Sequence, residues 1–355
     1  MRLLLIGPIP PPLGGATVLF NQLVDELAQR KDLHVEVLNT SRIHRSSAKN
    51  LVQGFRTLVA LLRRIRHTEV VGLHASIRGA ALFGPVVSVI CYMCGRPWIF
   101  RGFGGFYPNW YQAAPIPIRW LFRHTVLAAD TVLFETRLSV EFFTSITRRP
   151  VCWYANSRVL SDIPARDGTH SDRGARRFVF LGHVSEVKGV RDLIRASREL
   201  DGVTIDVYGP ITDQLTQEDF IGSSVTYMGV VEPMVVPDLL RGYDVLVLPS
   251  RYWAEGYPGA VLEAFSAGIP VIASSIGAIP EIVGERNGIL IEPGRVDQLV
   301  TAIKMLRDDS RYFSTLQLGA KESALQFSSD RWTAEFVRHC RNISRGLQPP
   351  THNAT

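Results

Sequence analysis

Short apolar segments alternate with helix-like segments along the whole chain, in two successive runs. The strand-like segments of the first run are Leu3–Gly7, His34–Leu38, Val70–His74, Trp98–Arg101 and Thr131–Phe134. Those of the second run are Phe178–Leu181, Val203–Tyr208, Val225–Gly229, Val245–Leu248, Val271–Ala273 and Gly288–Ile291. Short apolar strands separated by helices form parallel sheets that are covered on both faces. The sequence therefore predicts an α/β protein with two doubly wound, Rossmann-like domains.

The length of 355 residues fits two domains, and 46% hydrophobic against 20% charged content indicates a folded chain. We expect an N-terminal domain over residues 1–165, a C-terminal domain over 166–330, and a final helix with a frayed tail over 331–355. The polar stretch Ser161–Arg177 is the expected linker. Residues Met1–Gly7 resemble a first strand rather than a signal peptide, so we expect a cytoplasmic protein.

Charge is distributed unevenly between the two expected domains. Residues 1–165 hold 19 Lys and Arg against 9 Asp and Glu, whereas residues 166–355 hold 20 against 24. The chain shows no interleaving of aromatic and basic residues and no nucleic-acid-binding module, so nucleic acid is not an expected partner. The basic half fits an anionic acceptor or an anionic membrane surface, which would place the protein peripherally on the inner face of the plasma membrane.

Two segments of the first half bear on the membrane question. Gly79–Gly95 carries no charge over 17 residues, but its internal glycine and proline and its place between two strands favour a buried helix over a span. Leu51–Arg66 combines arginines with leucines, which fits either a helix on anionic lipid or an ordinary amphipathic helix. Cys91 and Cys94 are predicted to be small core residues rather than metal ligands.

Two glutamates frame the most specific loop of the chain. Glu255 and Glu263 bound the run Glu-Gly-Tyr-Pro-Gly-Ala-Val-Leu-Glu, which follows an apolar strand and precedes a helix. Its glycines allow backbone N–H groups to approach a ligand, and the helix start offers free N–H donors to a phosphate. We place Glu263 in the first helical turn, where it can meet ribose hydroxyls, and Glu255 in a solvent-facing loop beside a sugar. The loop therefore predicts a nucleotide-sugar ligand.

The stretch Asp244–Val283 resembles the donor-binding signature of retaining glycosyltransferases of family 4. The matching features are the spaced glutamates, Pro249-Ser250 before them, and the Ala-Gly-x-Pro-Val-Ile-Ala-Ser run over Ala267–Ser274. The resemblance implies the GT-B fold, in which two Rossmann-like domains face a central cleft and a C-terminal helix crosses back to the N-terminal domain. It also implies transfer from a nucleoside-diphosphate sugar with retention of the anomeric configuration.

Transfer leaves negative charge on the departing diphosphate, so the site needs cations or helix N-termini. Lys188 follows a strand and precedes a helix, as in the family's Gly-Arg…Lys-Gly segment, and is expected to neutralise the diphosphate. His183 stands where the family has arginine; either it contacts phosphate weakly or another cation such as Arg251 replaces it. The chain has no Asp-x-Asp motif, so we expect no metal ion and no other cofactor.

The other donor-binding residues lie around these elements. Gly14 and Gly15, in the turn after the first strand, resemble the family's glycine loop, whose backbone approaches donor and acceptor. Glu263 is expected to hold the ribose and Glu255 the donor sugar near its anomeric carbon. Val231, at the end of a strand, is expected to border the base. Around the helix start, in the run Tyr257, Pro258, Gly259 and Ala260, the backbone N–H groups of the three residues other than proline are expected to meet sugar or phosphate oxygens.

Family members often carry a histidine after the fourth strand of the N-terminal domain, near the reacting sugar. Arg101 occupies that place here. An arginine cannot act as a base, but it can bind an anionic acceptor or the donor phosphate. His74 and His124 are the alternative histidines. We therefore expect Glu255, Lys188 and Arg101 to take a direct part in the transfer.

Together these features predict a retaining, metal-independent hexosyltransferase that acts on a glycan or lipid-linked acceptor in polysaccharide or glycoconjugate synthesis. Two alternatives stay open. A sugar-phosphate synthase would use a basic acceptor pocket, which Arg101 allows. A GT-B module that binds nucleotide sugars without turnover is compatible with the changes at His183 and Arg101, whereas the retained glutamates and Lys188 argue against it.

Overall fold

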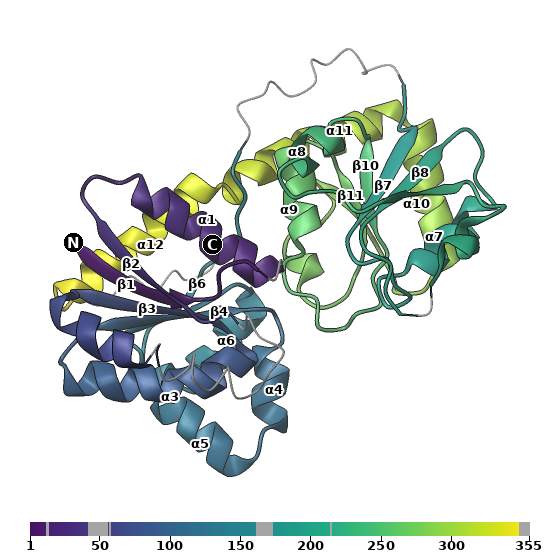
Figure 1. Cartoon of the computed structure of the whole chain (residues 1–355). Coiled ribbons are helices and arrows are strands. Elements are labelled where there is room, and N and C mark those ends of the chain that lie inside the picture. The colour runs from purple at the N-terminus through teal and green to yellow at the C-terminus, as the bar shows by residue number, and fades with distance from the viewer. Residues whose placement is uncertain (12–13, 42–55, 57, 161–172, 214, 348–355) are drawn as a thin grey trace. The chain divides into compact units, whose positions relative to one another are not determined.

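The computed structural model describes residues 1–11, 14–41, 56, 58–160, 173–213 and 215–347 (Figure 1). The chain forms two compact units. Unit 1 comprises Met1–Asn156 and Ser329–Thr355, and unit 2 comprises Ser157–Ser328. The chain thus passes from one unit to the other at 156/157 and at 328/329. The predicted boundaries are 165/166 and 330/331. Most of the expected linker, residues 161–172, lies outside the described residues.

Unit 1 is built on a six-stranded parallel sheet with the order β2-β1-β3-β4-β5-β6. Its strands are β1 (Arg2–Gly7), β2 (His34–Asn39), β3 (Val70–Ser76), β4 (Trp98–Phe103), β5 (Thr131–Phe134) and β6 (Val151–Trp153). Leu3, Leu4 and Leu5 are at most 1% exposed, as expected for a strand with helices on both sides. The strand order changes direction between β1 and β3, so the loops after these two strands begin at neighbouring positions.

Helices cover both faces of the first sheet (Figure 1). They are α1 (Gly15–Ala28), α3 (Ile77–Met93), α4 (Tyr107–Ala113), α5 (Ile116–His124), α6 (Arg137–Thr144) and α12 (Ser329–Ser344), with 3-10 turns η1 (Ile65–His67) and η2 (Val126–Ala128). Helix α12 follows unit 2 in sequence, yet Trp332 and Phe336 are buried in unit 1. The ring centroid of Trp332 lies 4.9 Å from that of Trp153. The predicted return of the C-terminal helix to the N-terminal domain is confirmed.

Unit 2 contains a second six-stranded parallel sheet, with the order β12-β11-β10-β7-β8-β9. Its strands are β7 (Arg177–Leu181), β8 (Thr204–Tyr208), β9 (Val225–Gly229), β10 (Val245–Leu248), β11 (Val271–Ser274) and β12 (Gly288–Ile291). The chain enters in the middle at β7, adds β8 and β9 on one side, and then builds β10 to β12 on the other. This is the doubly wound order in which ligands bind beside the strand ends where the direction changes. In unit 2 that point lies between β7 and β10.

The second sheet also has helices on both faces, with α8, α9 and α11 on one side and α7 and α10 on the other (Figure 1). The bounds are α7 (Val190–Ser197), α8 (Val236–Leu240), α9 (Gly259–Ser266), α10 (Val296–Asp308) and α11 (Ser310–Gln326), with η3 (Gln217–Phe220) and η4 (Ile279–Glu281). The four residues of β10 are at most 3% exposed. Two covered parallel sheets confirm the predicted α/β class with two doubly wound domains.

The uncharged segment Gly79–Gly95 is only half buried, which corrects the prediction of a buried helix. It makes up most of α3, whose residues Ala80, Gly84 and Val87 face the core. Cys91 is buried, and burial raises the pKa of its thiol to about 12, whereas Cys94 is exposed and therefore not a core residue. No helix among the described residues is both long and apolar enough to cross a membrane.

His74, on β3, lies at the centre of unit 1 among aromatic rings. It is 1% exposed, and its ring centroid lies 4.9 Å from that of Phe20 on α1 and 5.3 Å from that of Phe336 on α12. Neither ring nitrogen makes a hydrogen bond to the described part of the chain. Burial, followed by the charge of Arg101, lowers the pKa of His74 well below its ordinary value. His74 is therefore a neutral core residue.

We expect His74 to make the stability of the protein fall in mild acid. Below about pH 6.5 the unfolded chain binds a proton at His74 and the folded chain does not. The free energy of unfolding should therefore fall by about 1.4 kcal/mol for each pH unit below that value. Denaturant unfolding of the wild type and of His74→Leu, on both sides of that pH, measures the difference. The His74→Leu variant should lose this part of the pH dependence, and His67→Gln at an exposed position should keep it. Equal pH dependence in all three proteins would contradict a neutral His74.

Candidate functional site

Five of the eleven predicted donor-binding residues lie on two loops of unit 2. One loop follows β7 and runs from Gly182 to Gly189, and the other follows β10 and runs from Pro249 to Pro258. Strands β7 and β10 are adjacent and parallel, with Val245 opposite Phe178. Both loops therefore leave the carboxyl ends of neighbouring strands at the point where the strand order changes direction. This is the position at which doubly wound sheets bind nucleotides.

Lys188 and Glu255 form an ion pair across the two loops. The Nζ atom of Lys188 donates to Oε1 of Glu255, and the same oxygen accepts a hydrogen bond of 2.7 Å from Oγ of Ser250. Nζ also lies 5.3 Å from the centroid of the Tyr252 ring. Oε2 of Glu255 makes no hydrogen bond or ion pair within the described ranges, so its lone pairs are available to a ligand.

The side chain of Glu255 is 7% exposed, which corrects the expectation of a solvent-facing loop. The sequence does not reveal this, because burial depends on contacts between distant segments, and one such contact brings Gly277 against the backbone of Glu255. There the backbone turns with φ of +58°, and a Cβ atom would lie 2.3 Å from the carbonyl oxygen of Glu255. A buried carboxylate is held in a fixed position when a cation and a hydroxyl both bind it.

The backbone holds the two loops together as well. The amide of Arg251 donates to the carbonyl of Val187 at 2.8 Å, which fixes Lys188 one residue later. Gly189 then ends the first loop with φ of +78°, and a Cβ atom there would lie 2.0 Å from the carbonyl oxygen of Pro249. Only glycine permits this close approach, which starts α7 directly behind Lys188.

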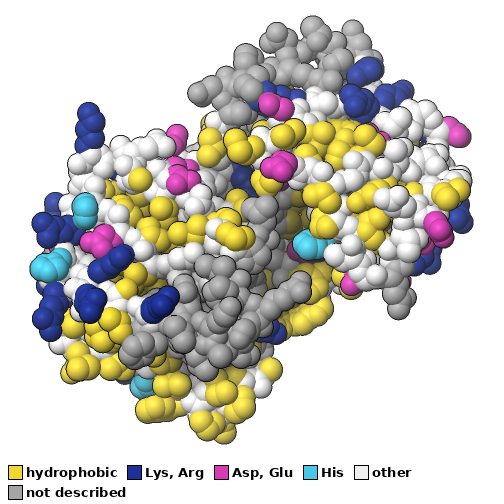
Figure 2. Space-filling model, viewed as in Figure 1, with side chains coloured by type: hydrophobic (Ala, Val, Ile, Leu, Met, Phe, Trp, Pro, Cys, Tyr) yellow, Lys and Arg dark blue, Asp and Glu magenta, His cyan; other side chains and the backbone are white. Residues whose placement is uncertain are grey.

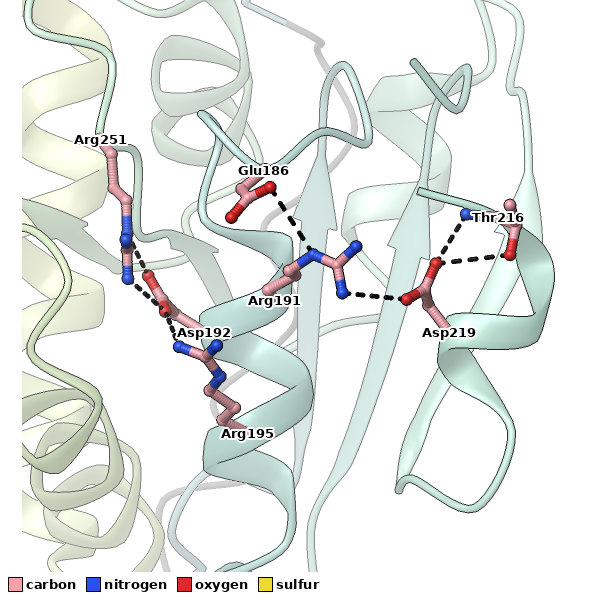
Figure 3. A network of polar contacts seen from close by, with 7 residues as sticks. All are labelled: Glu186, Arg191, Asp192, Arg195, Thr216, Asp219 and Arg251. Carbon is pink, nitrogen blue, oxygen red and sulfur yellow. Dashed lines mark hydrogen bonds and ion pairs between the residues drawn. The ribbon is translucent and has the colours of Figure 1, made fainter. Parts of the chain in front are cut away.

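A network of ion pairs anchors the first turn of α7 (Figure 3). Buried Asp192 accepts two hydrogen bonds from Arg251, at 2.8 Å from Nε and 2.7 Å from Nη2. These bonds raise the pKa of Arg251. Arg195 lies 3.8 Å from Asp192 on the same helix. Arg251 thus joins the loop after β10 to α7. Its Nε and Nη2 atoms bind Asp192, so these two donors are not available to a phosphate.

The neighbouring residue of α7 extends this network toward β9 (Figure 3). Arg191 pairs with Asp219 at 3.1 Å and with Glu186 at 3.8 Å. Asp219 in turn accepts a 2.8 Å hydrogen bond from the amide of Thr216. These bonds, chiefly the hydrogen bond from Thr216, lower the pKa of Asp219. Glu186 belongs to the Lys188 loop, so this network attaches that loop to α7.

Glu263 lies on α9, beyond its first turn, which corrects the predicted position. Its Oε1 accepts a 2.9 Å hydrogen bond from Nε of Arg158. The guanidinium of Arg158 lies over the helix start, because a Cβ atom at Gly259 would come within 2.2 Å of its Nη2. Arg158 was missed in the sequence, where nothing marks a single arginine just before the linker. The open N–H groups of Gly259 and Ala260 and the charge of Arg158 make this helix start attractive to an anion.

Of the other predicted donor residues of unit 2, two have structural roles and two lie in loops at one edge of the sheet. Tyr257 is 3% exposed, and its hydroxyl donates to Glu281 at 2.7 Å, so its side chain is part of the fold. Pro258 caps α9. His183 is exposed in the loop after β7, and half-buried Val231 follows β9 at the same edge of the sheet. No group of three potential metal-ligating side chains occurs within the described ranges.

Gly14 and Gly15 begin α1 in unit 1, directly after the loop from β1. The amide of Gly14 donates to Oγ1 of Thr17 at 3.0 Å. A Cβ atom at Gly15 would meet no atom within 4 Å, and φ of neither glycine is in the left-handed region. Internal packing therefore does not require glycine at position 15. A ligand that approaches the backbone would require it.

Arg101, on β4, is a buried cation at the register position beside His74. Its guanidinium carbon lies 4.3 Å from the ring centroid of Tyr154 and 4.8 Å from that of Phe103. Nε has no hydrogen-bond partner in the part of the chain that the structure describes. Burial lowers the pKa of Arg101, against the opposing charge of Glu135. The alternative His124 lies elsewhere, exposed at the end of α5 and stacked on Trp120.

Residues 175–309 match the family model described as glycosyl transferases group 1. The chain is 32% identical over 151 residues to a putative teichuronic acid biosynthesis glycosyltransferase of Bacillus subtilis. That match takes in 42% of this chain and spans only 36% of the relative's length.

Two solved structures resemble nearly the whole chain. Sucrose-phosphate synthase from Thermosynechococcus elongatus matches 98% of this chain and 100% of that chain, with a TM-score of 0.72 and 16% identity. HepE of Anabaena in complex with UDP matches 97% of this chain and 99% of that chain, with a TM-score of 0.72 and 16% identity. These likenesses confirm the predicted two-domain α/β fold of the GT-B type.

We expect Asp192→Ala to loosen the attachment of the Lys188 loop. The change leaves Arg251 without its two hydrogen bonds and should lower the free energy of unfolding by about 1–3 kcal/mol in a urea titration. Asp238→Ala is a matched control, because Asp238 is 69% exposed and pairs with Arg241 at 3.2 Å, so its loss should cost less than about 1 kcal/mol. Equal effects of the two substitutions would show that the Asp192 pair does not hold the loop.

Proposed function

We propose that the protein is a retaining glycosyltransferase of family 4, which transfers a sugar from a nucleoside-diphosphate sugar to a glycan or lipid-linked acceptor. The observation that carries this proposal is the ion pair of Lys188 and Glu255, held by Ser250 where the second sheet changes direction. The match of residues 175–309 to group 1 glycosyl transferases supports the reaction type. The name of the Bacillus subtilis relative supports a role in polysaccharide synthesis, and the UDP complex of HepE supports a nucleotide donor.

The donor diphosphate would bind at the two positive positions of unit 2. Lys188 reaches across the two loops with a charged amino group, and a diphosphate would compete with Glu255 for it. The start of α9 supplies N–H donors beside Arg158. Glu263, already held by Arg158, faces the position of a ribose, and the free Oε2 of Glu255 accepts a hydroxyl of the sugar.

The same arrangement suits a reaction with retention. The bond between the anomeric carbon and the diphosphate breaks, and the acceptor oxygen bonds to that carbon from the same face. The acceptor proton passes to the departing diphosphate oxygen. Lys188 stabilises the negative charge that develops there, which is the largest demand of the reaction. The sequence offers no Asp-x-Asp motif for a metal ion, so we assign this charge to side chains and N–H groups and propose a metal-independent reaction.

We assign acceptor recognition to unit 1. Buried Arg101 lies against two aromatic rings and within reach of the charge of Glu135, and its Nε has no hydrogen-bond partner among the described residues, so a phosphate or another anionic group of the acceptor would supply one. Gly14 and Gly15 leave the start of α1 open to a ligand. A lipid-linked acceptor, which carries phosphate between lipid and sugar, fits this chemistry.

Glu255→Gln tests the proposed function directly. Glutamine keeps the size of the side chain but weakens the contact to Lys188 and the sugar, so transfer should fall by about 100-fold or more. The control is Glu199→Gln in unit 2, because Glu199 is exposed and lies outside the two loops and the ion-pair network around them. Transfer is followed as release of nucleoside diphosphate, with thermal unfolding as the check of the fold. A folded Glu255→Gln variant with the activity of the control would exclude Glu255 from the reaction.

The substitution Gly15→Ala tests whether a ligand approaches the backbone at the start of α1, because it should affect transfer but not the packing of the protein. The substitution fills empty space in the folded chain, so the free energy of unfolding should change by less than about 1 kcal/mol. If a ligand lies against this backbone, the added methyl group should displace it and slow transfer by about 100-fold. Gly284→Ala is the control, since a Cβ atom there also meets nothing within 4 Å. Equal transfer rates of the two variants would remove the turn after β1 from the site.

A further inference from the structure

Helix α3 is apolar on two opposite faces, and among the described residues only one of these faces is covered. The covered face packs on β3 and β4 through small and branched residues. The other face carries Leu82, Val86, Val89 and Met93, which are 59%, 42%, 52% and 77% exposed. Their spacing of four, three and four residues places them in one stripe along the helix. A soluble helix normally exposes polar residues at these positions.

Helix α5 packs against α3 and continues the exposed apolar surface. Phe122 is its single buried residue, whereas Ile116 and Trp120 are 73% and 61% exposed. Figure 2 shows hydrophobic side chains gathered at the end of unit 1 that α3 and α5 form. We call this surface the α3–α5 patch. Its exposed members are Leu82, Val86, Val89, Tyr92, Met93, Ile116, Ile118, Trp120 and Leu121.

The charged residues of helices α3 and α5 are all arginines. The sequence has no Asp or Glu between Glu69 and Asp130, and the arginines of this stretch include Arg78, Arg119 and Arg123 on the two helices. Arg78 and Arg123 are exposed, and Arg119 is partly exposed. Arginine extends its apolar stem along such a surface and keeps its charge at the rim.

We propose that the α3–α5 patch docks on the surface of a lipid bilayer that contains anionic lipids. Tryptophan and tyrosine favour the interface between headgroups and acyl chains, where Trp120 and Tyr92 would lie. The apolar stripe of α3 supplies burial, and the arginines supply attraction to anionic headgroups. A surface with aromatic residues, aliphatic residues and arginines but no carboxylate is complementary to such a membrane in both polarity and charge. Docking goes beyond the transfer reaction, because it requires no donor.

Flotation of the full chain with vesicles tests this proposal. Vesicles of phosphatidylcholine with phosphatidylglycerol should carry the protein upward, and vesicles of phosphatidylcholine alone should carry much less. The variant Val89→Gln with Trp120→Gln removes one exposed side chain from each helix and should weaken binding by about tenfold or more. The matched control is Leu318→Gln with Leu325→Gln on α11 of unit 2, whose side chains are 62% and 65% exposed. The control should bind as the wild type does.

The variant Arg119→Gln with Arg123→Gln tests the charge separately. It should weaken binding to the anionic vesicles by about fivefold for each arginine and reduce the loss of binding on addition of salt. All substitutions lie at exposed or partly exposed positions, and thermal unfolding checks that each variant is folded. Absence of binding to anionic vesicles at low salt would overturn the proposal. It would equally be overturned if the patch and control variants bound alike, or if sedimentation showed that the patch joins two copies of the chain.

Discussion

The ion pair between Lys188 and Glu255 is the contact on which the proposed site depends. It joins the two loops that leave neighbouring strands of unit 2 at the point where the strand order changes direction. The carboxylate of Glu255 is 7% exposed, and burying a carboxylate or an amino group without a partner costs free energy. The attraction between the two opposite charges offsets part of this cost. In the proposed function, the pair would keep a cation in place for a phosphate and a carboxylate in place for a sugar before either ligand arrives.

The surrounding structure keeps that pair in one geometry. Arg251 binds Asp192 through its side chain and Val187 through its backbone, so the loop after β10 is tied to the helix and the loop that follow β7. Gly189 allows the backbones to approach closely enough for these bonds. When the side chains and loops of a binding site are already ordered, binding a ligand costs less conformational entropy. In the proposed site, the hydrogen bonds between Asp192 and Arg251 would therefore favour donor binding without contact to the donor.

The alternation of strands and helices was enough to predict two doubly wound sheets, because its signal lies in local apolar runs. This alternation did not predict β6, because three residues are too few to show an apolar strand pattern. The motif around Glu255 predicts a donor site, but it does not show that the side chain of Glu255 is buried, and nothing local marks the contact of Arg158 with Glu263, which is 105 residues distant. Periodicity also cannot say which apolar face a protein covers. This is why α3 was expected to be buried and instead exposes a stripe.

The most direct test of the central claim is the thermal unfolding midpoint of the wild type and of Lys188→Ala with UDP-, GDP- and ADP-sugars, in the presence of a chelator. A ligand that binds only the folded protein raises its stability in proportion to its affinity. We predict that one donor raises the midpoint of the wild type without metal, and that Lys188→Ala loses most of this shift. A shift that depends on added metal, or one that Lys188→Ala keeps in full, would contradict the account.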